Sequence, residues 1–244
     1  MLIRKPLVIA CLAFAPLVHA QEIENWEGEA ELGVLMTSGN TDETKINGRL
    51  GLINEQEFWR NSGEFSTKYT EADDETTAEE YRAALETNYK FDEQQYWFLR
   101  GNWEDDRFSG YEFESSVTTG YGNRVWRAGE RSFLDLSAGA GYRYNKRMEV
   151  DPDTGRDVEE DAIARLAAQF DYGLSENSLF RQKLSTEIGL DDNNTISRSE
   201  TSLQSSIMNN LSMKVAYRVK HVSDAPEDSE STDTELAVSL LYGF

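Results

Sequence analysis

The last eleven residues of the chain, TELAVSLLYGF, constrain its fold more than any other stretch. Their apolar side chains recur at every second position, so one face of the segment carries Thr234, Leu236, Val238, Leu240, Tyr242 and Phe244. A repeat of two residues is typical of a β-strand, because successive side chains point to opposite faces. Chain ends are usually polar and frayed. The sequence therefore predicts a strand that is built into a sheet up to its final residue.

Two kinds of sheet can contain such a strand. A terminal phenylalanine with a tyrosine two residues earlier resembles the assembly signal that outer-membrane β-barrels present to their insertion machinery. On this interpretation the signal consists of Leu236, Val238, Leu240, Tyr242 and Phe244. The alternative is the half-buried edge strand of a soluble antiparallel sheet. The rest of the chain must discriminate between them.

The N-terminal stretch predicts export. Arg4 and Lys5 precede an apolar run from Leu7 to Val18, and Val18-His19-Ala20 forms a site like the small-x-small cleavage pattern before Gln21. This order is typical of a cleaved secretory signal, and the run is too short for a helix across a bilayer core of ~30 Å. We expect residues 1–20 to be removed and residues 21–244 to form one barrel domain. The single cysteine, Cys11, lies in the signal, which excludes disulfides and thiolate metal sites from the mature chain.

The composition is unusual for a membrane protein. The net charge is −21, the mean hydropathy is −0.63, and no run reaches the ~18 apolar residues of a membrane helix. A membrane barrel, however, needs apolar residues only at alternate positions across a band ~25 Å tall, while its lumen and loops are polar. An aromatic content of 11% argues against disorder. The low hydropathy is therefore compatible with a barrel.

Alternating segments recur with room for about twelve strands. The sixth, for example, sets Tyr111, Phe113 and Val117 on one face. The run from Ala162 to Tyr172 could be a helix by propensity, but its charged residues keep to odd positions, which favours a strand. We predict an all-β fold, a single antiparallel transmembrane β-barrel of about 12 strands.

The expected connections form two alternating sets. Brief ones lie near 54–57, 92–94, 126–131, 175–177 and 209–210, and mostly longer, acidic ones at 71–77, 104–110, 147–160, 191–195 and 223–233. Short periplasmic turns and longer extracellular loops are typical of outer-membrane barrels. A lipocalin-like soluble barrel also alternates, with its apolar face inward.

Charge and aromatic placement favour the membrane barrel. Aromatic residues such as Trp26, Trp59 and Trp97 gather toward strand ends, as interfacial girdles do. Both signs of charge recur at the polar positions, as a narrow lumen requires. The residues predicted to line the lumen are Lys45, Arg49, Glu64, Lys68, Arg82, Glu86, Arg100, Arg143, Arg165, Arg181, Glu187, Arg198, Lys214 and Arg218.

The segment from Trp26 to Leu52 also carries a family signature, which consists of Gly28, Glu29, Glu31, Leu32, Gly33, Thr37, Ser38, Gly39, Asn40 and Thr41. It resembles the salt-induced outer-membrane protein family, a YdiY-like family with a domain of unknown function. The resemblance implies an outer-membrane barrel of a Gram-negative cell and supplies no catalytic residues. Gly39-Asn40 suits a hairpin turn; a recognition site at the outer rim is the alternative for Ser38–Thr41.

Candidates for chemistry are few. His221 and Ser223 could suggest an outer-membrane lipase, but residues two apart on a strand lie ~7 Å apart, and a nucleophile needs its base within hydrogen-bond reach. Asp151, Asp153 and Asp157 are weak metal candidates in the longest loop, because carboxylates suit Ca²⁺. Their spacing departs from the EF-hand pattern, and solvated acidic loops are the alternative.

The sequence thus predicts a non-enzymatic barrel without cofactors. We expect a small passive, porin-like channel or a barrel of the salt-stress response; the alternative is a closed structural barrel whose acidic loops bind divalent cations, lipopolysaccharide or a partner. The expected partners are outer-membrane lipid, lipopolysaccharide, the barrel-assembly machinery through the C-terminal strand, and small ions or solutes. A net charge of −21 disfavours nucleic acid.

Overall fold

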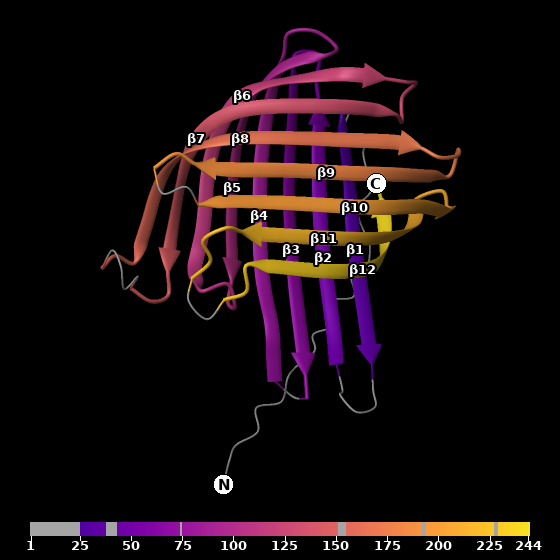
Figure 1. The fold of residues 1–244 in the computed structure, drawn as a ribbon. Coiled ribbons are helices and arrows are strands. Elements are labelled where there is room, and N and C mark those ends of the chain that lie inside the picture. Colours follow the sequence, from indigo (N-terminus) through magenta and orange to yellow (C-terminus); the bar gives the residue numbers. More distant parts are fainter. Residues whose placement is uncertain (1–24, 38–42, 74, 151–154, 192–193, 227–228) are drawn as a thin grey trace.

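The chain folds into one closed barrel of antiparallel strands (Figure 1). The computed structural model describes residues 25–37, 43–73, 75–150, 155–191, 194–226 and 229–244, so the expected signal peptide and the turn at Ser38–Thr41 lie outside the described residues. The strands are β1 (Trp26–Thr37), β2 (Glu43–Glu55), β3 (Trp59–Ala72), β4 (Glu75–Lys90), β5 (Gln95–Asp106), β6 (Tyr111–Arg127), β7 (Phe133–Arg147), β8 (Val158–Gly173), β9 (Ser178–Gly189), β10 (Thr195–Met208), β11 (Leu211–Val222) and β12 (Thr232–Gly243). The predicted fold of about 12 strands is confirmed, including a strand at 162–172. In the described part of the chain, no helix has the length and apolar character needed to cross a membrane.

The barrel is apolar outside and polar inside. Large apolar side chains stay exposed on every strand, for example Leu85, Leu166, Leu203 and Leu236. The buried residues are largely polar or charged and include Glu31, Glu104, Arg143, Asp161, Arg165, Glu187 and Lys214. A soluble barrel buries its apolar face instead. The alternation of each strand therefore places its polar face toward the interior.

Aromatic rings cluster where the strands meet the short turns. Trp59 lies 5.0 Å from Tyr89, and Trp126 lies 5.9 Å from Phe170, between ring centroids. These rings sit on the outward face at one end of the barrel. Such a belt is typical of an interface between apolar and aqueous surroundings.

Glycines let β6 and β7 approach closely on the inner face. A Cβ atom at Gly120, Gly139 or Gly141 would overlap a backbone carbonyl oxygen of the neighbouring strand. Phe98 lies opposite Gly120 in the β5–β6 register, and its ring occupies the space that the missing side chain of Gly139 leaves. The strands that follow β7 cross in front of β1–β5 at a steep angle (Figure 1). The lumen is therefore enclosed by two facing halves, and side chains from one half can reach the other.

The C-terminal strand closes the barrel against β1. Registered pairs run from Glu29↔Gly243 to Leu32↔Leu240. The Phe244 N–H donates to the Gly28 carbonyl at 2.9 Å, and the Gly28 N–H donates to the Phe244 carbonyl at 2.8 Å. The residues of the expected assembly signal, Leu236, Val238, Leu240, Tyr242 and Phe244, are all exposed.

Two local expectations were wrong. The connection expected at 71–77 is much shorter, because β3 runs to Ala72 and β4 already starts at Glu75, and Asp73 has a positive φ of 50°. Tyr111 does not share an exposed face with Val117. A register shift between Tyr111 and Phe113 turns its ring inward, where it is 1% exposed and donates to Glu159 at 3.1 Å.

Candidate functional site inside the barrel

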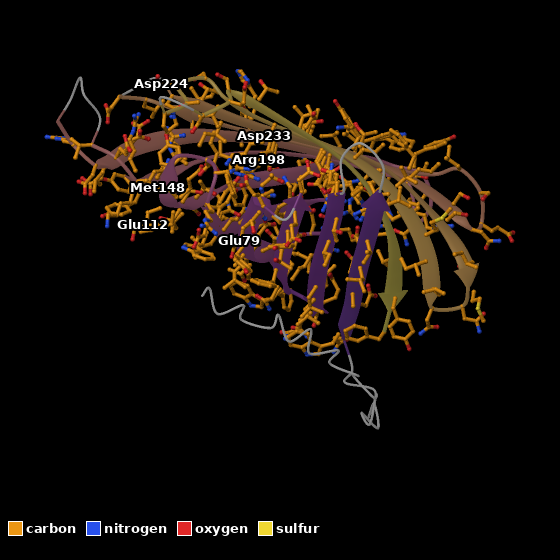
Figure 2. All side chains as sticks on the ribbon, turned by 90° about the horizontal axis from the view of Figure 1, so that it is seen from below. Glu79, Glu112, Met148, Arg198, Asp224 and Asp233 are labelled. Atoms are coloured by element: carbon orange, nitrogen blue, oxygen red, sulfur yellow. The ribbon has the colours of Figure 1, made fainter. Side chains whose placement is uncertain are left out.

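Glu104 on β5 joins cations from three other strands. Its carboxylate accepts hydrogen bonds from Lys220 Nζ at 2.5 Å, Arg198 Nη2 at 2.9 Å and Arg82 Nε at 3.0 Å. In the closed order of the strands β5 and β11 lie diametrically opposite, so the Lys220–Glu104 bond crosses the lumen. Lys220 also donates to Glu114 of β6 at 2.8 Å. Figure 2 shows Arg198 among the side chains inside the barrel, whereas Asp224 and Glu112 lie toward its loop end. This cross-lumen cluster, formed by Arg82, Glu104, Glu114, Arg198 and Lys220, ties the two halves together near the longer loops.

A second cluster lies nearer the middle of the barrel. Lys214 Nζ of β11 lies 3.2 Å from both Glu31 of β1 and Glu200 of β10. Glu31 also accepts a hydrogen bond from Ser239 Oγ at 2.6 Å. Arg49 of β2 hydrogen-bonds Glu64 and comes within 3.7 Å of Glu200, so this cluster also spans the two halves. Buried charges are tolerated when they are compensated in this way.

Further ion pairs lie near both ends of the interior. At the short-turn end, Arg124 forms a bidentate pair with Asp135 at 2.8 Å and lies 4.1 Å above the Phe133 ring. At the loop end, Arg143 Nη2 donates to the Asn194 carbonyl at 2.9 Å and lies 3.5 Å from Asp161. Bidentate arginine–carboxylate pairs fix geometry as well as charge.

Every residue predicted to line the lumen occupies the face opposite the exposed apolar side chains, as the alternation in each strand requires. Lys45 lies near the rim, 2.9 Å from Glu43, and Lys68 lies 3.9 Å from Glu80. Arg100 pairs with Glu86 at 3.0 Å. The other residues of the set belong to the two clusters or make a polar contact with their own or a neighbouring strand. Arg165 has the weakest contact among them.

The lumen set predicted above leaves out three central carboxylates, Glu31, Glu104 and Glu114. Each shares the parity of the inward-facing residues of its own strand, as Glu114 does with Thr118 on β6. Glu104 and Lys220 carry the right parity in the sequence, but parity does not reveal that they meet.

The two candidates for catalysis, His221 and Ser223, bond to different partners. His221 Nδ1 contacts Thr232 Oγ1 at 2.8 Å, while the Ser223 hydroxyl accepts the Thr195 N–H at 2.8 Å. Asp151 and Asp153 lie outside the described residues, which leaves the metal hypothesis for that loop untested. Within the described ranges, no group of three or more His, Cys, Asp or Glu side chains is arranged to hold a metal ion.

Comparison with known proteins places this chain in a family. The DUF481 profile, described as a protein of unknown function, matches residues 30–244. The chain belongs to the DUF481 family. The uncharacterized protein YdiY of Escherichia coli (strain K12) is 28% identical to it over 223 residues, which cover 89% of this chain and 82% of that relative. The expected YdiY-like family is therefore confirmed.

Solved structures share the barrel fold. An outer membrane channel from Pseudomonas putida F1 matches with a TM-score of 0.52 and 12% identity, over 90% of this chain and 95% of that one. The translocator domain of the autotransporter NalP from Neisseria meningitidis matches with a TM-score of 0.50 and 9% identity, over 90% and 87%. At these identities the likeness shows the fold alone.

Proposed function

We propose that this chain is a narrow channel of the Gram-negative outer membrane that conducts small ions or solutes without enzymatic activity. The single observation that carries the proposal is the charged interior inside an apolar outer surface. A barrel that only filled its interior would be served by apolar packing, whereas charged side chains on the inner face favour a hydrated lumen. The exposed apolar band and its aromatic ends support a position in a bilayer.

The dimensions and ion pairs of the lumen support a low conductance. Barrels of 16–18 strands leave an aqueous channel, and this barrel has twelve. The cross-lumen cluster narrows the interior further, because Lys220 and Glu104 meet from opposite walls at 2.5 Å. We therefore expect passage of small ions and exclusion of bulky solutes. In the proposed orientation the short turns face the periplasm, and residues 1–20 act as the export signal.

Single-channel recording tests the proposal directly. The purified protein is reconstituted in a planar bilayer, and folding is checked first by the heat-dependent mobility of the barrel in a denaturing gel. Discrete, reproducible current steps, larger for Glu104→Gln than for the unmodified protein, support a channel. If neither the folded, unmodified protein nor the variant gives current steps, the proposal is rejected.

A closed interaction barrel is the second candidate, and the cross-lumen cluster is the observation that favours it. In that case the function lies in the acidic loops, which can share divalent cations with lipopolysaccharide phosphates. Exposed carboxylates at the loop end include Glu149, Glu160, Asp191 and Asp224. Binding of the folded protein to lipopolysaccharide vesicles that requires Ca²⁺ or Mg²⁺ and is abolished by a chelator would support this function.

We further propose that the C-terminal strand engages the barrel-assembly machinery and that expression responds to salt, as the resemblance to the salt-induced family implies. Both are independent of conduction. The first is supported by the exposed side chains of Leu236, Val238, Leu240, Tyr242 and Phe244 on one face of β12. Reporter expression at low and high external salt tests the second.

A further inference from the structure

Arg165 is the inward-facing arginine of the described barrel with the weakest contacts. It lies in the middle of β8, opposite Gly139 of β7, and Gly139 in turn lies beside Gly120 of β6. The absence of side chains on these glycines leaves room for the long Arg165 side chain along the inner wall. Its guanidinium carbon lies 5.9 Å from the centre of the Phe98 ring. Arg165 is thus held inside the lumen, with 9% of its surface exposed.

The guanidinium of Arg165 lacks a hydrogen-bonded acceptor among the described residues. Its nearest carboxylate is Glu187, at 3.8 Å from Nε, which is beyond hydrogen-bond distance. The buried Nε atom has no partner. By contrast, Arg124 places two nitrogens on Asp135 at 2.8 Å each. A buried guanidinium normally satisfies its donors, because leaving them unmade is costly.

Two neighbouring side chains, those of Arg100 and Thr118, also have a buried hydrogen-bond donor without a partner. Arg100 and Thr118 lie directly opposite each other in the β5–β6 register, one row along from Phe98 and Gly120. The Thr118 hydroxyl is buried without a partner, in a residue that is 1% exposed, and Arg100 Nε is also buried without one. Arg100 keeps Glu86 on one terminal nitrogen at 3.0 Å. Unused donors from β5, β6 and β8 therefore gather on one stretch of the inner wall.

The surrounding charges leave this stretch open to an anion. The charged groups that act most strongly on Arg165 are Arg100, Glu187, Glu86 and Arg198. Both carboxylates already accept other donors, Glu86 from Arg100 and Glu187 from the Ser116 hydroxyl at 3.3 Å. Arg165 is the inward-facing arginine of the described residues that has no carboxylate within hydrogen-bond distance, since Glu187 lies 3.8 Å from its Nε.

We propose that Arg165, Arg100 and Thr118 form a binding site for an oxyanion, a carboxylate, sulfate or phosphate group, on the inner wall of the barrel. The planar guanidinium of Arg165 offers paired N–H donors that match two oxygens of such a group. Arg100 Nε and the Thr118 hydroxyl supply further donors. The site rests on the proposed channel function and makes it more specific, because it gives the lumen a preference for oxyanions. Binding itself does not require conduction.

Calorimetric titration of the full barrel in detergent tests the site separately from conduction. The probes are inorganic sulfate, inorganic phosphate and acetate, with chloride as the non-oxyanion comparison. We expect saturable binding of at least one oxyanion, which Arg165→Gln weakens on the order of tenfold or more, as the loss of charge-assisted hydrogen bonds implies. Thr118→Val, close in shape but without the hydroxyl, should weaken binding severalfold.

Matched variants guard against trivial explanations. Arg124→Gln removes an inward-facing arginine whose donors Asp135 already occupies, so it should bind the probes as the unmodified protein does. Arg165→Lys keeps the charge and loses the fork, and it should bind more weakly than the unmodified protein even if Arg165→Gln fails to fold. Preference for acetate identifies a carboxylated solute, and preference for sulfate or phosphate identifies an inorganic ion.

Three results would overturn the site. The first is absence of saturable binding of all three oxyanions to the folded, unmodified protein, whether or not it conducts. The second is equal loss of binding in Arg124→Gln and Arg165→Gln, which would indicate a general charge effect. The third is full affinity in Arg165→Lys.

Discussion

Glu104→Gln should weaken the barrel more than any exposed charge substitution. The change removes a carboxylate of which 5% is exposed and which accepts hydrogen bonds from Lys220, Arg198 and Arg82. Lys220 keeps Glu114 at 2.8 Å and Arg82 keeps Glu80 at 2.7 Å. Arg198 keeps only a contact of 4.0 Å with Glu114, so it is the cation that is left uncompensated.

The expected loss follows from that count. Removing one partner of a buried ion pair costs about 3–5 kcal/mol of unfolding free energy when the other charge stays buried and unpaired. Two of the three cations here retain a carboxylate, and glutamine still offers an oxygen acceptor. We therefore expect a loss of about 2–3 kcal/mol, at or below the low end of that range.

Denaturant unfolding of the protein in lipid vesicles, followed by tryptophan fluorescence, measures the loss. The control is Glu93→Gln, because Glu93 is 90% exposed and lies 3.6 Å from Arg127 in a turn. Exposed pairs of this kind contribute little to stability, so the control should unfold at the same denaturant concentration as the unmodified protein. If Glu104→Gln also unfolds at the same denaturant concentration as the unmodified protein, the cross-lumen cluster does not hold the two halves together, and the physical reasoning fails.

Three further predictions concern the wall and the edges of the barrel. Gly139→Val should lower the yield of folded barrel, because a side chain there overlaps the Thr119 carbonyl. The control Gly101→Ala should fold normally, because a Cβ at that position has nothing within 4 Å. Refolding yields are compared on gels, and equal yields of the two variants would contradict the tight β6–β7 approach. Deletion of Phe244 removes two backbone hydrogen bonds to Gly28 and should slow assembly in cells, measured by the fraction of heat-modifiable protein; an unchanged fraction would show that this closing contact is dispensable. His221→Ala should leave any lipase activity of purified protein unchanged, because His221 contacts Thr232; an activity lost in the variant would revive an enzymatic role.

The strands could be predicted from the sequence because one rule decides them. Alternation places each apolar side chain outward and each polar one inward, and it outweighed helix propensity at 162–172, which is a strand in β8. The same parity assigned the inward face for Arg165, Arg198 and Lys214. These assignments depend only on neighbours along one strand.

The meeting of side chains across the lumen could not be predicted in this way. Lys220 reaches Glu104 because the closed order of the strands places β11 opposite β5 across the lumen, and that closure is a property of the whole barrel rather than of either strand. Bulges are the second limit. One extra residue beside Phe113 reverses the face of Tyr111, and nothing in the local alternation marks it.

The excess negative charge and the ion pairs of the lumen have separate places in this barrel. The interior carries acids and bases that largely compensate one another, so the net charge of −21 falls mainly on the strand ends and loops. Among the described residues, the loop end carries more of the exposed carboxylates, including Glu149, Glu160, Asp191 and Asp224. The short-turn end has fewer, among them Asp92, Glu93 and Glu176, and sets the exposed Arg127 and Arg131 beside them. An acidic mouth lowers the local concentration of anions. We therefore expect an oxyanion to approach Arg165 from the short-turn end, while the acidic loops hold cations at the opposite mouth.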